Sequence, residues 1–175
     1  NDKIKSAGIY SNIATVYTRQ SKFKEALDLN FKSLKLYEQI GDSANQANIL
    51  GNIGILYYNL EQNKSANEFF VKGLRLARLC HKQLIEANIL IELGGIKFEE
   101  GVKNDIIVNR KELDSALLYF NDANTILTEY NAIYNLAVVN NNIGRIYVQL
   151  NDYEKATQYY NQGLIYRQQM NDDYG

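Results

Sequence analysis

The run Ile53-Gly54-Ile55-Leu56-Tyr57 is a pattern that this 175-residue sequence uses four times. A shift of forty residues places it on residues 13–17, and related runs stand at 93–97 and 143–147. Each run is followed by an alanine, twelve residues after the small residue in three copies and ten residues later still in the third. These alanines are Ala26, Ala66, Ala116 and Ala156. Self-similarity at a fixed period is typical of a repeat architecture.

The apolar residues around each run follow the spacing of a helix. Ile49, Ile53 and Leu56 are separated by four and three residues, which places them on one face of an α-helix. A glycine inside a helix costs about 1 kcal/mol relative to alanine, so its recurrence needs a packing reason. The repeated glycines are Gly54, Gly94 and Gly144. We expect a second helix to approach each run there, with the residue four positions after the repeated alanine filling the gap. Those residues are Asn30, Phe70, Phe120 and Tyr160.

The absence of proline permits helices along nearly the whole chain. We predict four helical hairpins, at about 2–40, 43–80, 82–128 and 131–170, with an insertion at 102–111. The turn between the first two is marked by Gly41-Asp42-Ser43, and Asn109 with Glu112 is a capping pair for the sixth helix. Asn171 falls where the repeat phase begins again, so we expect a single array cut from a longer protein.

The order apolar-small-x-x-Tyr, then Ala, aromatic, small and Leu at fixed offsets, resembles the tetratricopeptide repeat. The resemblance covers all four hairpins and implies an all-α fold, a right-handed α-solenoid of four antiparallel helical hairpins. Two features depart from the family pattern: the period is forty residues rather than about 34, and the proline near the end of the second helix is missing. This is similar to the long variant in kinesin light chains, bacterial peptide-pheromone receptors and the sensor regions of some bacterial histidine kinases.

The resemblance implies a peptide- or protein-binding groove lined by the first helix of each hairpin. The family's groove positions, together with an off-consensus tyrosine that would point the same way, fall on Asn12, Asn48, Asn52, Tyr58, Asn88, Glu92, Asn141, Asn142 and Arg145. Arg19 and Asn59 lie on the same predicted side. An amide carries a donor and an acceptor, so it can bind a peptide backbone of any sequence. The alternative is that these amides bridge adjacent helices or face water.

The insertion carries three consecutive branched apolar residues, Ile106, Ile107 and Val108. Either they pack against an adjacent helix, or they form an apolar edge for a partner.

Composition argues against several other classes of function. The 19 basic and 20 acidic residues are interspersed, whereas a nucleic-acid binder usually shows a basic stripe. Cys80 is the only cysteine and His81 the only histidine, so no internal disulfide and no two-histidine metal site can form within the chain. We expect no catalytic residues, no metal, no cofactor and no membrane insertion of this segment. The compartment, cytoplasm or periplasm, stays open.

We therefore predict a protein- or peptide-binding module, the sensing or docking region of a larger bacterial signalling protein such as a sensor histidine kinase. The alternative is a passive assembly scaffold that binds a folded partner through its convex face or the insertion. We also expect self-association through the C-terminal helix, whose residues Tyr159, Tyr160, Leu164, Ile165 and Tyr166 are more apolar surface than one neighbour can cover.

Overall fold

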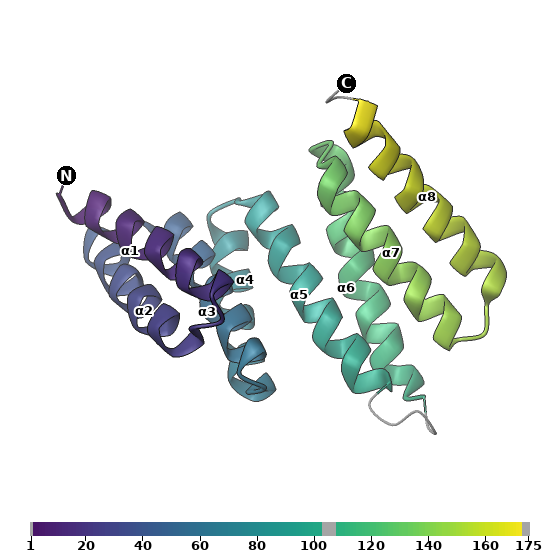
Figure 1. Ribbon diagram of the computed structural model, residues 1–175, viewed down its shortest axis with the longest axis horizontal. Helices are drawn as coiled ribbons and strands as arrows, with labels where there is room; N and C mark the ends of the chain where they lie inside the picture. Colours follow the sequence, from purple (N-terminus) through teal and green to yellow (C-terminus); the bar gives the residue numbers. More distant parts are fainter. Residues whose placement is uncertain (1, 103–107, 173–175) are drawn as a thin grey trace. The chain divides into compact units, whose positions relative to one another are not determined.

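A computed structural model describes residues 2–102 and 108–172, with side chains as far as residue 170. These residues form eight α-helices and, over the same ranges, no strand, which confirms the all-α prediction (Figure 1). The helices are α1 (Asp2–Arg19), α2 (Phe23–Ile40), α3 (Ser43–Asn59), α4 (Asn63–Leu79), α5 (Gln83–Val102), α6 (Arg110–Glu129), α7 (Ile133–Gln149) and α8 (Tyr153–Asp172). Each predicted helix is present, with ends within a few residues of those expected.

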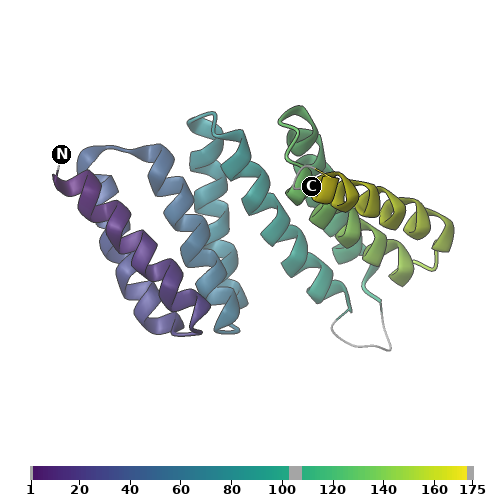
Figure 2. The same ribbon diagram turned by 45° about the horizontal axis from the view of Figure 1, so that its top comes forward.

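The chain divides into two compact units, residues 1–89 and 90–175, and the division falls inside α5. In the first unit α1 packs against α2 and α3 against α4, while α2 also packs against α3 (Figures 1 and 2). In the second unit α7 packs against α8 and α6 against α7. Helix α5 lies beside α6, where the Phe120 ring faces Gly94.

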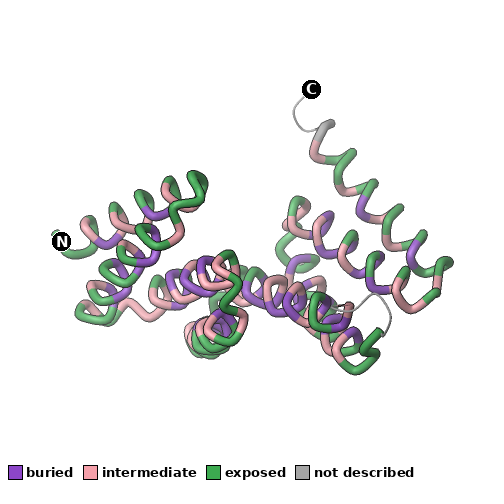
Figure 3. The backbone as a smooth tube through the Cα atoms, turned by 60° about the horizontal axis from the view of Figure 1, so that its bottom comes forward, coloured by how far each residue is buried: buried purple, intermediate pink, exposed green. Residues whose placement is uncertain are grey.

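The repeated glycines have the packing role that the sequence predicts. A Cβ atom added at Gly54 would lie 2.6 Å from the Phe70 ring, and one at Gly144 would lie 2.7 Å from the Tyr160 ring. Real Cβ atoms do not approach so closely, so only glycine admits the aromatic ring. The buried residues lie mainly along the faces by which the helices of a hairpin meet (Figure 3). The first hairpin differs, because it pairs Ala14 with Asn30, and both are buried.

Six turns between helices within the described ranges contain a residue with left-handed backbone. Gly41 has φ 71° and ends α2, and the Asp42 carboxylate accepts a hydrogen bond from the Asn45 backbone N–H at 3.0 Å, capping α3. Five further turns of the described chain have a non-glycine residue with positive φ, namely Ser21, Glu61, His81, Asn131 and Asn151. Cys80 and His81 thus belong to a turn at the end of α4.

The predicted capping pair at the start of α6 is wrong in one respect. Asn109 is the residue before the helix, but its side chain makes no capping hydrogen bond. The Glu112 carboxylate instead lies 2.8 Å from the Lys97 ammonium on α5, because a cation is a stronger partner for a carboxylate than a backbone amide. Helix α5 also continues to Val102, so it takes up the beginning of the predicted insertion.

Of the apolar residues in the insertion, Ile106 and Ile107 lie outside the described residues. Val108 is described and is exposed.

Candidate functional site

The predicted groove residues of the first unit have unequal surroundings. Asn12, Asn48 and Asn88 are exposed, whereas Asn52 and Tyr58 are half-buried. Asn52 lines a cavity of about 260 Å³ between α1, α2 and α3. The other residues lining this cavity are Thr15, Thr18, Arg19, Asn30 and Ile55. The structure thus brings together Asn52 and Arg19, two residues that the sequence placed on one side.

One polar residue of this cavity, Asn30, was expected only as a replacement for the aromatic of the other hairpins. Its side chain is 2% exposed, and its Nδ2 donates a hydrogen bond to the Ala26 carbonyl at 3.1 Å. Its Oδ1 is buried and has no hydrogen-bond partner within the described part of the chain. The sequence does mark Asn30 as unusual, because the other three hairpins carry an aromatic residue at this position, namely Phe70, Phe120 or Tyr160.

In the second unit, α7 and α5 contribute residues that meet. The Arg145 guanidinium lies over the Phe98 ring at 4.5 Å from its centroid, a cation–π contact. The Arg145 Nη1 also donates to the Asn142 Oδ1 at 3.5 Å, a long and weak hydrogen bond. Asn142 is half-buried and Arg145 is exposed, so both keep hydrogen-bonding capacity toward a ligand.

Glu92, at the position equivalent to Asn52 and Asn142, is partly buried on α5. Burial raises the pKa of its carboxyl group, because removing the charge from water disfavours the ionised form. Among the predicted groove residues, Glu92 is therefore the one whose ionised form is disfavoured by burial.

Two other asparagines use their amides in hydrogen bonds within the protein. Asn140 is buried, and its Nδ2 donates to the Asn124 Oδ1 at 3.2 Å and to the Leu136 carbonyl at 2.9 Å, joining α6 to α7. The amide of Asn59 donates to the Ile55 carbonyl of its own helix. The predicted groove residues Asn12 and Asn52 make no side-chain hydrogen bond of this kind within the described ranges.

Asn141 lies at a second cavity, of about 200 Å³, between α7 and α8. Its lining includes Gly163, which corresponds in the repeat to Gly73. In the first unit the equivalent space is filled, since the Ile89 side chain lies 3.0 Å from the position of a Cβ on Gly73. The residue equivalent to Ile89 in the first hairpin is Ile9, which is 56% exposed.

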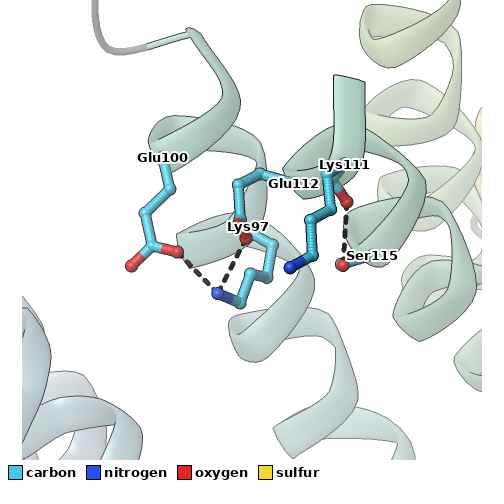
Figure 4. Close-up of polar contacts among 5 residues, drawn as sticks. All are labelled: Lys97, Glu100, Lys111, Glu112 and Ser115. Carbon is cyan, nitrogen blue, oxygen red and sulfur yellow. Dashed lines mark hydrogen bonds and ion pairs between the residues drawn. The ribbon is translucent and has the colours of Figure 1, made fainter. Parts of the chain in front are cut away.

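Lys97 stands where the other hairpins have Tyr17, Tyr57 or Tyr147, and it holds α5 to α6. Its Nζ lies 2.7 Å from the Glu100 carboxylate and 2.8 Å from that of Glu112 (Figure 4). These two hydrogen-bonded carboxylates raise the pKa of Lys97, and Lys97 in turn lowers the pKa of Glu112. This cluster joins the two helix ends that flank the insertion.

No group of three His, Cys, Asp or Glu side chains within the described ranges is arranged to hold a metal ion. No helix within those ranges combines the length and apolarity needed to cross a membrane.

Comparison with known proteins places these hairpins in a family. Models of the tetratricopeptide repeat match residues 5–78 and residues 137–169. The comparison with curated proteins found no match.

Solved structures share the fold at low sequence identity. BtubC (BKLC) from P. vanneervenii is 20% identical with a TM-score of 0.77, over 94% of this chain and 64% of its own. Aspartyl phosphate phosphatase F from Bacillus subtilis is 18% identical with a TM-score of 0.85, over 98% of this chain and 43% of its own. MamA is 15% identical with a TM-score of 0.54, over 96% of this chain and 95% of its own. The chain thus spans less than two thirds of the first two proteins.

The two family matches together cover more than half of the sequence, and they fall on helical hairpins packed by the same small and aromatic residues. The chain belongs to the tetratricopeptide repeat family.

Proposed function

We propose that this chain is a peptide-binding module that holds an extended segment of a partner against the first helices of its hairpins. The family and its fold support a role in protein–protein interaction. One observation carries the finer proposal: the amides at the repeated position of Asn12, Asn52 and Asn142 remain exposed or half-exposed. Helix packing does not bury them, in contrast to Asn30 and Asn140.

The amides suit a ligand in extended conformation. An extended peptide presents backbone N–H and C=O groups in alternation, and each asparagine can donate to one and accept from another. A single such hydrogen bond is worth about 0.5–1.5 kcal/mol net, so affinity depends on several acting together. Side-chain preference must then come from the surroundings of the amides, such as Arg19 or Arg145.

The biological setting that we propose is the sensing or docking region of a larger signalling protein, such as a bacterial sensor histidine kinase. The fold shared with aspartyl phosphate phosphatase F, a protein whose name denotes a phosphatase for aspartyl phosphate, supports a signalling context. We propose no catalytic role for this segment.

A second candidate is an assembly scaffold, and the cavity beside Asn141 favours it. That cavity corresponds to the space that Ile89 fills in the first unit, and the equivalent Ile9 is exposed. If Ile9 of one copy entered this cavity in another copy, the two copies would associate through α1 of the first and α8 of the second. The exposed Val108 of the insertion is a further apolar contact point for a partner.

The peptide-binding proposal is tested with peptides selected from a random library on the purified chain. The double variant Asn52→Ala/Asn142→Ala should weaken the selected peptide about 5- to 150-fold, the equivalent of two lost hydrogen bonds, and leave the melting temperature nearly unchanged. The matched control is Asn67→Ala/Asn121→Ala, which removes two exposed amides from the second helices α4 and α6. Loss of binding in the control variant, with binding intact in the first, would refute the proposal.

A further inference from the structure

The third hairpin carries a carboxylate where the other three carry an amide. At this repeated position of the predicted groove the other hairpins have Asn12, Asn52 and Asn142, and the third has Glu92. An asparagine amide both donates and accepts hydrogen bonds, whereas an ionised carboxylate only accepts. Glu92 therefore cannot bind the C=O groups of a peptide backbone, and the third hairpin requires something different from a ligand.

The Glu92 carboxylate has no partner within the described ranges, where it forms neither a hydrogen bond nor an ion pair. The basic residues of α5 and α7 are Lys97 and Arg145. Lys97 is held by two other carboxylates, at 2.7 and 2.8 Å, and the Arg145 guanidinium lies over the Phe98 ring. Both cations are thus engaged elsewhere, and neither neutralises Glu92.

The carboxylate is partly buried and yet open to a ligand. Among the buried and half-buried residues that the structure describes, the only unpaired side-chain nitrogen or oxygen closed to solvent belongs to Asn30. The unpaired oxygens of the half-buried Glu92 are therefore in contact with solvent. One turn further along α5, a Cβ atom added to Gly95 would meet nothing within 4 Å. Residues three apart are neighbours on a helix surface, so open space adjoins Glu92.

A partly buried charge without a partner is unfavourable for folding. Burial disfavours the ionised carboxyl group of Glu92 and raises its pKa, and no cation within the described chain compensates. Glutamine would have nearly the same size without the charge, and asparagine stands at this position in the other three hairpins. A titratable group in such surroundings is a candidate for a functional role, because structural roles do not require the charge.

A cation is the ligand group that this carboxylate favours. A backbone N–H or a hydroxyl group can donate to Glu92 but leaves the negative charge uncompensated. A carboxylate or phosphate is repelled, and an apolar side chain leaves the oxygens without a donor. An ammonium or guanidinium group supplies donors and a positive charge together, and hydrogen bonds between ionised groups are stronger than those between neutral ones.

We propose that Glu92 binds the basic side chain of a lysine or arginine in the bound peptide. This inference rests on the proposed function, and it assigns the groove a charge preference at the third hairpin.

The experiment follows the side-chain carboxyl carbon of Glu92 by nuclear magnetic resonance in the ¹³C-labelled chain. The probes are N-acetyl-arginine methylamide and N-acetyl-citrulline methylamide, which has nearly the same shape as the arginine probe but no charge. We expect saturable shifts with the arginine probe and about tenfold weaker apparent binding of the citrulline probe. Equal responses to the two probes, or no response of the Glu92 carbon to either, would overturn the proposal.

A third probe, glycine methylamide, distinguishes a basic side chain from the N-terminus of a peptide. It carries a free α-ammonium group and no side chain, so we expect it to shift the Glu92 carbon less than the arginine probe does. If it binds as well as the arginine probe, the site takes peptide N-termini and the proposal of a side chain is wrong.

Two variants separate direct binding from general attraction of cations. Glu92→Gln keeps the size of the side chain and removes a partly buried charge, so it should fold. It should lose the preference for the arginine probe, now followed at the side-chain amide that the substitution introduces. Glu99→Gln removes an exposed carboxylate two turns further along α5 and should keep the preference, because exposed charges about 10 Å apart are largely screened. A preference that persists in Glu92→Gln, or is lost equally in both variants, would contradict the proposal.

The outcome is distinguishable from failure of the proposed function. If selected peptides bind but show no enrichment of lysine or arginine, and the arginine probe does not shift the Glu92 carbon, this inference is wrong and the groove stands. If no peptide binds but the arginine probe is preferred in a way that depends on Glu92, the cation site stands and the proposed function is wrong.

Discussion

Gly94 and Gly95 are adjacent in α5, yet they have opposite surroundings. A Cβ atom on Gly94 would lie 2.8 Å from the Phe120 ring, whereas one on Gly95 would meet nothing within 4 Å. The pair therefore separates the two effects of a helical glycine, close packing and low helix propensity.

We predict that Gly94→Ala destabilises the chain and Gly95→Ala stabilises it. Overpacking against Phe120 costs about 1–3 kcal/mol, which outweighs the gain of about 1 kcal/mol in helix propensity. At Gly95 only the propensity gain applies, so the free energy of unfolding should rise by up to about 1 kcal/mol. Urea unfolding of both variants measures this, and equal effects at the two positions would show that Phe120 does not pack as described.

Glu92 gives a prediction that depends on pH. Its pKa is raised by burial, so the folded state binds its proton more tightly than the unfolded chain does. Its contribution to stability is present below the unfolded pKa of about 4.3 and is lost as the pH rises through the folded pKa. Glu92→Gln should therefore raise the melting temperature at pH 7, with the gain shrinking toward zero near pH 4. The exposed Glu68→Gln is the control, and a gain at Glu92 that is independent of pH would contradict the assignment.

At the scale of elements, the chain on either side of residues 103–108 is held together by contacts outside those residues. The Asn109 backbone N–H donates to the Gly101 carbonyl at 2.9 Å, and Lys97 on α5 pairs with Glu112 on α6. Gly101 also lies so close to Leu113 that an added Cβ would be 2.6 Å from its side chain. These contacts hold α5 and α6 together without any contribution from residues 103–108.

We predict that the insertion is dispensable for folding. Replacing residues 103–108 by Gly-Asn-Gly should lower the free energy of unfolding by no more than about 1–2 kcal/mol, since loop length changes closure entropy only slowly. Val102 and Asn109 are kept, because they belong to α5 and to the start of α6. Val108→Asn serves as the control and should be nearly neutral, because this side chain is exposed. Collapse of the shortened variant would place Ile106 and Ile107 in the core.

At the scale of the whole molecule, the repeat leaves matching surfaces on α1 and α8. Ile9 is exposed, and the cavity beside Gly163 corresponds to the space that Ile89 fills in the first unit. A contact between these two surfaces joins different patches of two copies, so it is a head-to-tail contact that can continue from copy to copy.

We predict weak, concentration-dependent self-association of the 175-residue chain. Ile9→Lys should weaken it at least tenfold, because it places a cation beside Arg167 in the lining of the cavity and costs more than about 1.4 kcal/mol. The control Val71→Lys changes a similarly exposed residue on α4 and should have no effect. Sedimentation equilibrium measures both, and a wild-type chain that stays monomeric at its highest soluble concentration would contradict the prediction.

Sequence alone determined the helices, their pairing into hairpins and the glycine–aromatic contacts such as Gly54 with Phe70. These features depend on spacing along the chain and on complementary side-chain size, both of which a repeated sequence displays directly. The pairing of Glu112 with Lys97 in place of a helix cap was decided only by the tertiary structure, as was the unpaired acceptor of Asn30. The physical reason is that a polar group takes whichever partner the fold brings within about 3 Å, and spacing along one helix does not specify the groups that other helices supply.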